Sequence, residues 1–559
     1  MKHPFRKIVL PILAFLAGGA ILFYFMLPAI NLRSAEFWGW LFLSLLCGGL
    51  TFFYLNRNHL TEIFGNFSLF THVAVAKQTP SGRKVMATEW KVNFTKRAKT
   101  VLIVIVAVAV VLLGAIFFSS SRVTRAKDYQ EMLTVTEADF AEDIAEMPIS
   151  QIPIVDRDTA SRLGNRKIGE VVELVSQFNV SEYYTQINYK TKPYRVSPLE
   201  YAGFLKWLAN TDEGIPYYIS IDMATQETDL VELSEGMRYS PSEYFTRDLT
   251  RHIRFAHPTK MFEELSFEVD DNGHPFWVMS YYDYTFGLFG GRDIQGIILV
   301  DAVSGKMTEY RVGEVPSWID RVYDSELVVE QANNWGSLKN GFWNSVFAQK
   351  NCVVTTDGYN YIAVNDDVWL YTGITSVSAD ESNIGFILIN MRTKEAKTYM
   401  INGAEEYSAM ESAEGQIQEK GYTATFPILI NVEDTPSYFI SLKDKAGTVK
   451  AYAFVSVAEY YIVGVADTIG GAMNEYLRLL GGSSSGGPDA GDTHTVTVTV
   501  SEVTTAVRDG NSVYYIKAED GTVYTATITV SDLLPFVKAG DTLTFVCDEK
   551  NQIVSIGEN

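Results

Sequence analysis

The chain has 559 residues, with 67 acidic and 46 basic side chains and a net charge of −21 at pH 7. This length is too great for one hydrophobic core and predicts two to four domains. The acidity argues against nucleic-acid binding, which depends on basic surfaces. Three cysteines are too few for a disulfide scaffold.

Three apolar stretches near the start predict an α-helical membrane anchor with three spans. They are Ile8–Leu27, Phe37–Tyr54 and Thr100–Phe118. The third stretch has nineteen residues without a charge, enough for a helix to cross the ~30 Å hydrocarbon core of a bilayer. The first stretch has the basic start of a signal peptide, but its length and the lack of an A-x-A cleavage site favour a retained span.

The distribution of charge predicts the orientation of this anchor. The first 99 residues hold twelve basic and three acidic side chains, and residues 55–99 alone hold eight of the basic ones. By the positive-inside rule, this loop and the amino terminus lie in the cytoplasm. We therefore expect residues 1–120 to lie in the cytoplasmic membrane, with the lipid bilayer as partner, and residues from about 120 onward to be extracytoplasmic. Within the loop, THVAVAK and KVMATEWKVNF flank TPSG and predict a small β-hairpin.

Residues 121–325 and 326–480 predict two extracytoplasmic α+β regions. Apolar spacing predicts helices in Asp156–Phe178, broken at Gly164 and resumed at Lys167, and in Pro198–Asn210. Further helical segments are expected in Ser240–Phe255, Pro316–Gly336 and Ala404–Gly421.

One hairpin pattern recurs between the helical segments. An apolar strand ends at Asp or Asn, a turn with Ser, Thr or Gly follows, and the return strand carries Tyr. The clearest copies are Ile297–Val312, Phe386–Ile401 and Tyr438–Ser456, and Asp270-Asp271-Asn272-Gly273 predicts a further tight turn. The irregular spacing, roughly 55 to 90 residues, favours duplicated α+β units over a solenoid.

The pattern, a PYW-type strand followed by hydrophobic-D-x-x-[ST]-G-[KE], resembles the PepSY domain, best over Ser240–Val312. The resemblance implies a helix packed on a hairpin-based sheet, in a non-catalytic extracytoplasmic module. The stretches DGYNYIAVNDDVWLYTGITSV and SNIGFILINMRTKEAKTY also look like uncharacterised membrane-anchored proteins of Gram-positive bacteria. That second resemblance implies a location and no activity.

The end of the chain predicts a flexible linker followed by a small β domain. Residues 481–492, GGSSSGGPDAGD, have linker composition. Residues 493–559 predict three strands, a helix-like SDLLPFVKAG and two more strands, which is the order of an OB-like barrel. The strands are expected at His494–Val507, Ser512–Ala518, Thr522–Val530, Thr542–Cys547 and Ile553–Ile556. Four basic and nine acidic side chains over residues 493–559 leave no basic groove, so protein or ligand contact is expected.

Familiar catalytic and cofactor signatures are missing, so the sequence assigns no catalytic residue, cofactor or metal ligand. H-E-x-x-H, C-x-x-C, G-x-S-x-G and G-x-x-x-x-G-K do not occur. Zinc at His252 and His257 is disfavoured because residues five apart do not share a helix face. The glycines of FGLFGGRDIQG (Gly287, Gly290, Gly291 and Gly296) are followed by a strand, which favours a wide bend over a phosphate cradle.

Two other candidate sites also have simpler structural interpretations. Asp270-Asp271 and Asp366-Asp367 lack the loop spacing of a calcium site and fit turns. A nucleophilic Cys352 would need a distant histidine, and its setting, NCVVTT, is typical of a strand. Cys352 and Cys547 fall in different predicted domains, so we expect two separate buried thiols.

Aromatic and amide side chains gather between residues 333 and 361. Aromatic faces stack on sugar rings and amides bind hydroxyls, although the same aromatic residues also build cores. The candidates for glycan contact are Asn334, Trp335, Trp343, Asn344 and Tyr361.

These features favour a non-enzymatic adaptor or sensor of the bacterial cell envelope, binding a protein partner or a wall ligand. Two alternatives stay open: a cell-surface peptidase or glycan-modifying hydrolase, and a peptidoglycan- or glycan-binding module.

Overall fold

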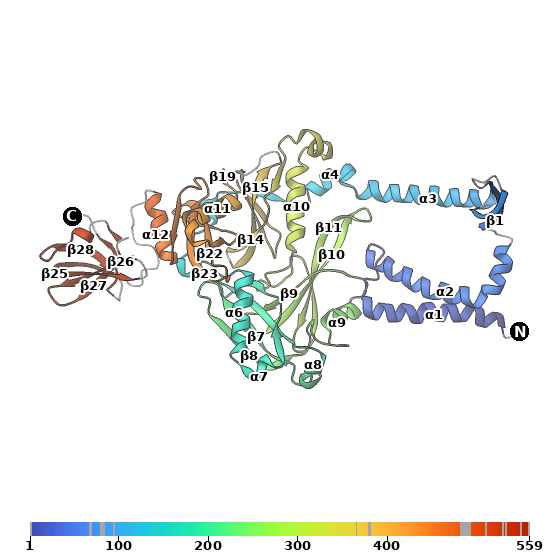
Figure 1. Ribbon diagram of the computed structural model, residues 1–559, viewed down its shortest axis with the longest axis horizontal. Coiled ribbons are helices and arrows are strands. Elements are labelled where there is room, and N and C mark those ends of the chain that lie inside the picture. Colours follow the sequence, from blue (N-terminus) through green and yellow to red (C-terminus); the bar gives the residue numbers. More distant parts are fainter. Residues whose placement is uncertain are drawn as a thin grey trace.

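The computed structural model is elongated, with three long helices at one end, a β-rich body in the middle and a small β unit at the other end (Figure 1). It describes residues 3–65, 70–78, 84–92, 96–364, 366–377, 382–480, 494–508, 511–527, 530–531, 534–547 and 551–556. The predicted linker, 481–492, lies outside the described residues.

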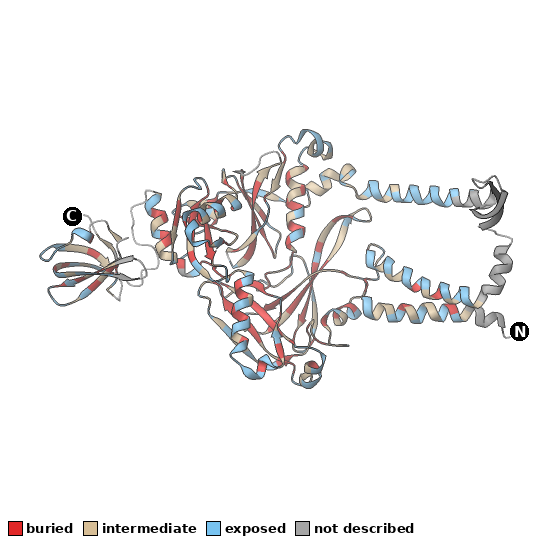
Figure 2. Ribbon diagram, viewed as in Figure 1, coloured by how far each residue is buried: buried red, intermediate tan, exposed pale blue. Residues whose placement is uncertain are grey.

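The three long helices are α1 (His3–Met26), α2 (Ala35–Gly65) and α3 (Lys96–Ser120), and all three are long and apolar enough to cross a membrane. The three predicted spans are confirmed to this extent. Glycines let α1 and α2 pack closely, because a Cβ at Gly18 or Gly48 would meet the facing helix at 3.0 Å. The helices expose most of their apolar side chains, as contact with lipid requires (Figure 2).

The predicted hairpin between the second and third helices is confirmed. Strands β1 (Phe70–Gln78) and β2 (Lys84–Val92) pair antiparallel. The turn sequence TPSG falls outside the described residues.

The first half of the body contains two antiparallel sheets. In the first sheet, of order β4-β6-β7-β8, β5 also pairs with β6; in the second sheet the order is β12-β11-β10-β9. The strands are β4 (Phe178–Val180), β5 (Thr185–Tyr189), β6 (Lys192–Tyr201), β7 (Ile215–Asp222), β8 (Thr228–Met237), β9 (Met261–Val269), β10 (Pro275–Phe286), β11 (Gly290–Asp301) and β12 (Met307–Arg311).

The second half of the body contains two more large sheets and a short strand pair. The third sheet has the order β13-β15-β17-β18-β3 with β14 on β15, and the fourth has β20-β22-β23-β24 with β21 on β22. The strands are β3 (Val135–Glu137), β13 (Val353–Thr355), β14 (Asn360–Val364), β15 (Asp367–Ser376), β16 (Ser382–Asn383), β17 (Gly385–Asn390), β18 (Ala396–Tyr399), β19 (Gly403–Ala404), β20 (Thr423–Ala424), β21 (Ile428–Val432), β22 (Thr435–Lys443), β23 (Val449–Ser456) and β24 (Val463–Ala466).

Short helices cover these sheets and connect them. They are α4 (Arg122–Gln130), α5 (Phe140–Asp143), α6 (Arg157–Gly169), α7 (Val172–Val175), α8 (Phe204–Asn210), α9 (Leu249–Ala256), α10 (Ser325–Ser337), α11 (Glu406–Gln416) and α12 (Ile469–Leu479). Single turns of 3-10 helix occur at Ile149–Gln151 and Gln418–Lys420, and a π-helical turn at Asn344–Ala348. The three helical segments expected between the hairpins do contain α9, α10 and α11, each shorter than predicted.

Two helix predictions are wrong in detail. Helix α6 continues through Gly164 without a break. A Cβ at Gly164 would collide with the Tyr184 hydroxyl, so this glycine permits close packing and does not end the helix. The stretch predicted as one helix from Pro198 begins instead with the last residues of strand β6, because pairing of Pro198 with β7 and of Leu199–Tyr201 with β4 overrides the helical pattern. Helix α8 starts only at Phe204.

The recurring hairpin pattern has a structural cause, and the three clearest predicted hairpins are confirmed. A side-chain oxygen at the end of the first strand accepts two backbone N–H bonds of 2.8–3.0 Å from the turn. The four residues that do so are Asp222, Asp301, Asn390 and Asp444. A later turn residue has a φ of 63–74° in each case. The Asp or Asn of the pattern therefore closes an Asx turn.

The two predicted α+β regions share a strand and a core. Strand β3, which precedes the first region's sheets, pairs in parallel with β18 of the second region. One hydrophobic cluster joins residues such as Ile219 and Trp277 to Phe439 and Tyr476.

The C-terminal unit is a five-stranded sheet of order β27-β26-β25-β28-β29 with its own core. Its strands, β25 (His494–Arg508), β26 (Asn511–Ala518), β27 (Val523–Thr527), β28 (Thr542–Cys547) and β29 (Ile553–Ile556), confirm the five predicted. The first half of β25 pairs with β28 and the second half with β26, across a register shift after Val500. Of the helix-like segment, a 3-10 turn at Leu534–Phe536 is described.

Candidate functional site

A groove lies between α4 and α10, beside the end of α3. It has a volume of about 410 Å³, within the ~300–1,000 Å³ range of small-molecule sites. Its lining residues are Arg122, Glu326, Val329, Glu330, Asn333, Asn334, Ser337 and Tyr359. Helix α4 follows the third apolar helix, α3, directly in the chain (Figure 1), and Arg122 of α4 lines the groove.

Helix caps and one ion pair fix the two walls. The Ser121 side chain accepts a hydrogen bond from Val123 N at the start of α4, and Asp324 does the same for Leu327 N at the start of α10. The Arg122 guanidinium lies 2.5 Å from a Glu330 carboxylate oxygen and links the walls. Both side chains are about half exposed, so the pair contributes at most about 1 kcal/mol.

The floor of the groove carries an amide without a partner. Asn333 is fully engaged, since its oxygen accepts from Thr355 N at 2.8 Å and its nitrogen donates to Thr355 Oγ1. Asn334 is only 4% exposed, and its side-chain amide has no hydrogen-bond partner among the described residues. With Ser337 and Tyr359, the Asn334 amide suits a ligand rich in hydroxyl or amide groups.

The five predicted glycan contacts do not converge. Asn334 alone lines the groove. Trp335 packs against the hydrophobic cluster that includes Leu327 and Ile389, and Lys339 Nζ lies 4.4 Å from the centre of its ring. Asn344 holds the π-helical turn by donating to Lys350 O at 3.0 Å.

The other two predicted contacts lie apart from the groove lining. Trp343 is 63% exposed and stacks on Phe347, with ring centroids 5.9 Å apart. Tyr361 lines a separate cavity, where its hydroxyl accepts from Arg321 Nη2 at 3.0 Å.

A second feature is the contact between the body and the ends of the three long apolar helices, here named the collar (residues 23–34, 119–129, 251–259 and 283–289). On the α1–α2 side, Arg254 Nε donates to Leu27 O at 2.9 Å and Ile30 N donates to Pro258 O at 2.6 Å. Arg33 Nη1 lies 2.8 Å from Asp283 Oδ1.

On the α3 side, the tip of the β10–β11 hairpin seats on the end of the helix. Ser120 Oγ accepts backbone N–H bonds from Leu288 and Phe289, both at 3.1 Å. Phe286 packs edge-to-face on Tyr129 of α4, with centroids 4.8 Å apart. Burial raises the pKa of Tyr129. The hairpin tip therefore touches both the third membrane helix and a helix that walls the groove.

The disfavoured chemical sites have structural roles. His252 Nε2 lies 2.9 Å from Gly305 O, and burial lowers the pKa of His257. Within the described residues, no group of three His, Cys, Asp or Glu side chains is placed to hold a metal. The bend between β10 and β11 begins at Gly287, whereas Gly290, Gly291 and Gly296 lie within β11.

The acidic pairs and the cysteines also have structural roles. Asp270 Oδ1 accepts turn N–H bonds, and Asp367 pairs with Arg392 at 2.7 Å. Cys352 is 3% exposed and donates to Ser337 O at 3.1 Å. Cys352 and Cys547 are separate buried thiols, as predicted, and no disulfide joins them.

Sequence reasoning missed the collar. Arg33 and Ser120 are ordinary polar residues beside apolar spans, and nothing near them indicates a partner some 170 to 250 residues away. The one available signal is the aromatic, glycine-rich tip FGLFGG, which is unusually apolar for a bend between two strands.

Comparison with known proteins gives no family. No protein-family model matches the chain, and no curated protein matches it. One solved structure similar to the chain is a mutant β-fructofuranosidase of glycoside-hydrolase family 32 from Bombyx mori, in complex with sucrose. It shares 11% identity over 72% of this chain and 70% of that chain, with a TM-score of 0.17. At that score the similarity says nothing about fold or activity.

Proposed function

We propose that this chain is a membrane-anchored, non-enzymatic adaptor or sensor of the bacterial cell envelope, which binds a wall or protein ligand outside the cytoplasm. The observation that carries the proposal is the placement of the groove. One wall is α4, next in the chain to the membrane helix α3, and the other is α10 of the body. A ligand that changes the separation of these walls would act directly on the end of α3.

The groove chemistry supports a wall ligand. Amide and hydroxyl groups line the groove, and the Arg122–Glu330 pair supplies one charge of each sign. Peptidoglycan fragments carry the hydroxyl, amide and carboxylate groups that such a lining can bind.

A binding experiment tests this proposal. Full-length protein in nanodiscs is titrated with soluble peptidoglycan fragments. We expect saturable binding that Tyr359→Ala weakens by about tenfold, the loss expected for one good contact. Tyr460→Ala is the matched control, because Tyr460 is also partly exposed but lies away from the groove. Turnover of the fragments would favour the hydrolase alternative, and equal binding by both variants would contradict the groove as the site.

The proposed topology has its own test. A cysteine placed at Ser485 should react with an impermeant reagent added to intact cells, and a cysteine placed at Ser81 should not. The reverse pattern would overturn the extracytoplasmic location of the body.

We also propose the finer fold assignments. Helix α9 followed by the antiparallel sheet β9–β12 supports the PepSY-like unit. In the C-terminal unit, the sheet order and a parallel bridge between Thr525 and Gln552 support an OB-like module for partner contact.

A further inference from the structure

A small cavity lies where three sheets of the body meet, away from the groove. Its lining includes Gln186 and Arg195 of the first sheet, Asn360 and Tyr361 of the third, and Phe439 and Ser441 of the fourth. The volume is about 30 Å³. A water molecule needs about 10–15 Å³ by this measure, so the cavity admits one small ion or a few waters and no organic ligand.

Arg195 brings a positive charge without a directly paired carboxylate to this cavity. It is 8% exposed, Nε donates to Val155 O at 3.1 Å, and Nη2 donates to Gln186 Oε1 at 3.3 Å. Both acceptors are neutral, and among the described residues no carboxylate forms an ion pair with Arg195, although the charge of Asp156 acts on it at longer range. Burial lowers the pKa of Arg195 to about 10, so the guanidinium is charged at neutral pH. Burying a charge that is not directly paired is unfavourable.

Gln186 adds a second donor. The side chain is 4% exposed, and Nε2 has no hydrogen-bond partner. Its orientation is fixed, because turning the amide over would place Nε2 against the Arg195 donor. Arg195 and Gln186 therefore leave unused N–H groups beside the same cavity.

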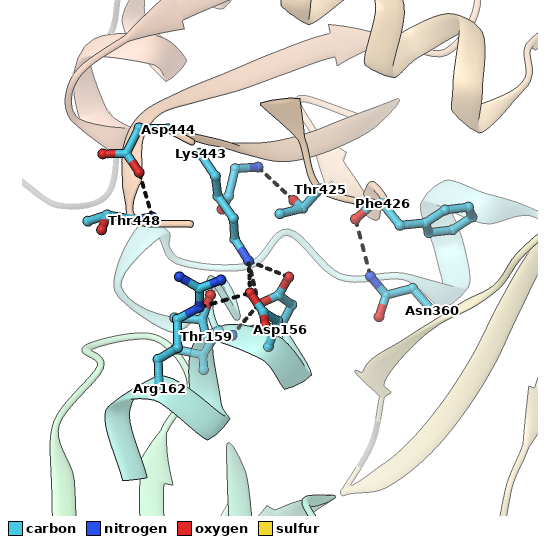
Figure 3. Close-up of polar contacts among 12 residues, drawn as sticks. Asp156, Thr159, Arg162, Asn360, Thr425, Phe426, Lys443, Asp444 and Thr448 are labelled. Carbon is cyan, nitrogen blue, oxygen red and sulfur yellow. Dashed lines mark hydrogen bonds and ion pairs between the residues drawn. The ribbon is translucent and has the colours of Figure 1, made fainter. Parts of the chain in front are cut away.

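The one carboxylate in the cavity wall is already neutralised. Lys443 Nζ lies 2.6 and 2.7 Å from the two Asp156 oxygens, and Thr159 N donates to Asp156 Oδ1 (Figure 3). Burial alone would raise the pKa of Asp156, but these bonds hold it below its usual value. On the opposite side, Asn360 turns its amide to the backbone of Phe426 and Pro427 (Figure 3). Asp156 therefore forms its ion pair with Lys443 and acts on Arg195 only through its charge at longer range, so one carboxylate serves two cations.

We propose that this cavity is a binding site for a small monovalent inorganic anion, held by Arg195 and Gln186. Arg195 and Lys443 share the single carboxylate of the cavity wall, Asp156, so the anion supplies a second negative charge there, and the neighbouring Arg157 and Arg321 add to the positive potential. Because its ligands and walls come from three sheets, the bound anion stabilises the junction between them. The proposal is independent of the groove and of any membrane signal.

Chloride is the probe. Thermal unfolding of the full-length protein in detergent micelles is compared in sodium chloride and in sodium gluconate at equal ionic strength, since gluconate is too large for the cavity. We expect the unfolding midpoint to rise with chloride alone and to saturate as a single site does. In crystals grown with bromide, an anomalous peak should lie within hydrogen-bond distance of Arg195.

Three variants identify the ligands. Gln186→Leu should raise the half-saturating chloride concentration by about tenfold, the loss of one bond to an ion. Arg195→Met should abolish the response, and Arg166→Met, on the exposed face of α6, should leave it unchanged. If Arg195→Met does not fold, Gln186→Leu and the bromide peak decide. Equal midpoints in the two salts would mean that the cavity holds water only, and a chloride response that is unchanged in Gln186→Leu would mean that the ion binds elsewhere.

Discussion

Gly287 lies against Ser120 at the end of α3, and no β-carbon fits between them. The close approach lets Ser120 Oγ accept the N–H groups of Leu288 and Phe289 at the tip of the β10–β11 hairpin. In the same hairpin, four residues before Gly287, Asp283 pairs with Arg33 of the α1–α2 connection. One hairpin therefore links the helical pair α1–α2 to α3, and its geometry sets how the body sits on the membrane helices.

The first prediction concerns this close approach. Gly287→Ala should separate the hairpin tip from α3, because the new methyl group collides with Ser119 and Ser120. Gly421→Ala is the matched control: both glycines have a φ of 61°, so both pay the same strain of about 1 kcal/mol, but Gly421 faces open space. Hydrogen exchange of the Leu288 and Phe289 amides should quicken in Gly287→Ala alone. Equal protection in the two variants would contradict the contact.

The second prediction concerns Arg33 and Asp283. The two side chains are 33% and 47% exposed, so the direct pair should be worth no more than about 1 kcal/mol. Arg33 also donates to Tyr284 O at 2.9 Å, and Asp283 has no part in that bond. Arg33→Met should therefore cost more stability than Asp283→Asn. A double-mutant cycle of thermal unfolding in detergent measures both, and a coupling well above 1 kcal/mol would mean that the pair is better shielded than its exposure indicates.

The third prediction separates the two tryptophans. Trp335→Ala should lower the free energy of unfolding by about 2–4 kcal/mol, because Trp335 packs against a core cluster. Trp343→Ala should change it by less than about 0.5 kcal/mol, because Trp343 is 63% exposed. Denaturant unfolding checks both values. If Trp343→Ala also leaves the binding of peptidoglycan fragments unchanged, the exposed tryptophan has no part in glycan contact.

The sequence predicts what local chemistry dictates. Long apolar runs can only be satisfied as buried or lipid-facing helices, and an Asp or Asn such as Asp301 that ends an apolar strand closes an Asx turn wherever it occurs. These features depend on neighbours a few residues apart. The three long helices, the hairpins and the five C-terminal strands can therefore be predicted from the sequence.

The rest depends on partners far away in the chain. Pro198 lies in a helical pattern, but it pairs with Tyr218 of β7, and Leu199–Tyr201 pair with β4, so this stretch forms the end of β6. Arg195 reads as one more surface charge, and only the meeting of three sheets makes it a buried cation. Likewise, Asn334 was among the candidates because of its aromatic neighbours in sequence, whereas the groove it lines is completed by Arg122 of α4. Such sites arise from tertiary packing, which residue spacing does not encode.

The last prediction concerns pH and two buried acids, Glu268 and Asp320. Glu268 is fully buried, and its carboxylate accepts hydrogen bonds from the backbone N–H groups of Asp320 and Arg321. Asp320 Oδ2 accepts a hydrogen bond from Asn188 N, whereas Asp320 Oδ1 has no hydrogen-bond partner among the described residues. Burial raises the pKa of Glu268 to about 7 and raises the pKa of Asp320 well above its usual value.

The sign of the effect follows from these raised pKa values. Below the ordinary pKa of a carboxyl group in the unfolded chain, the folded and the unfolded state both hold these protons, and the two buried acids make their full contribution to stability. As pH rises, the unfolded chain releases its protons first, so the folded state loses stability until Glu268 itself ionises near pH 7. The slope is at most about 1.4 kcal/mol per pH unit for each proton. The unfolding midpoint of the full-length protein should therefore fall between pH 5 and pH 7.

Glu268→Gln tests the assignment, because a neutral amide cannot titrate. The Glu268→Gln variant should be less stable than the unchanged protein at pH 5, because one backbone N–H group loses its acceptor. The unfolding midpoint of the variant should nevertheless fall less steeply with pH than that of the unchanged protein. Glu227→Gln, at an exposed turn position, is the control and should keep the original slope. Parallel curves for the Glu268→Gln variant and the unchanged protein would show that Glu268 is ionised in the folded state throughout this range.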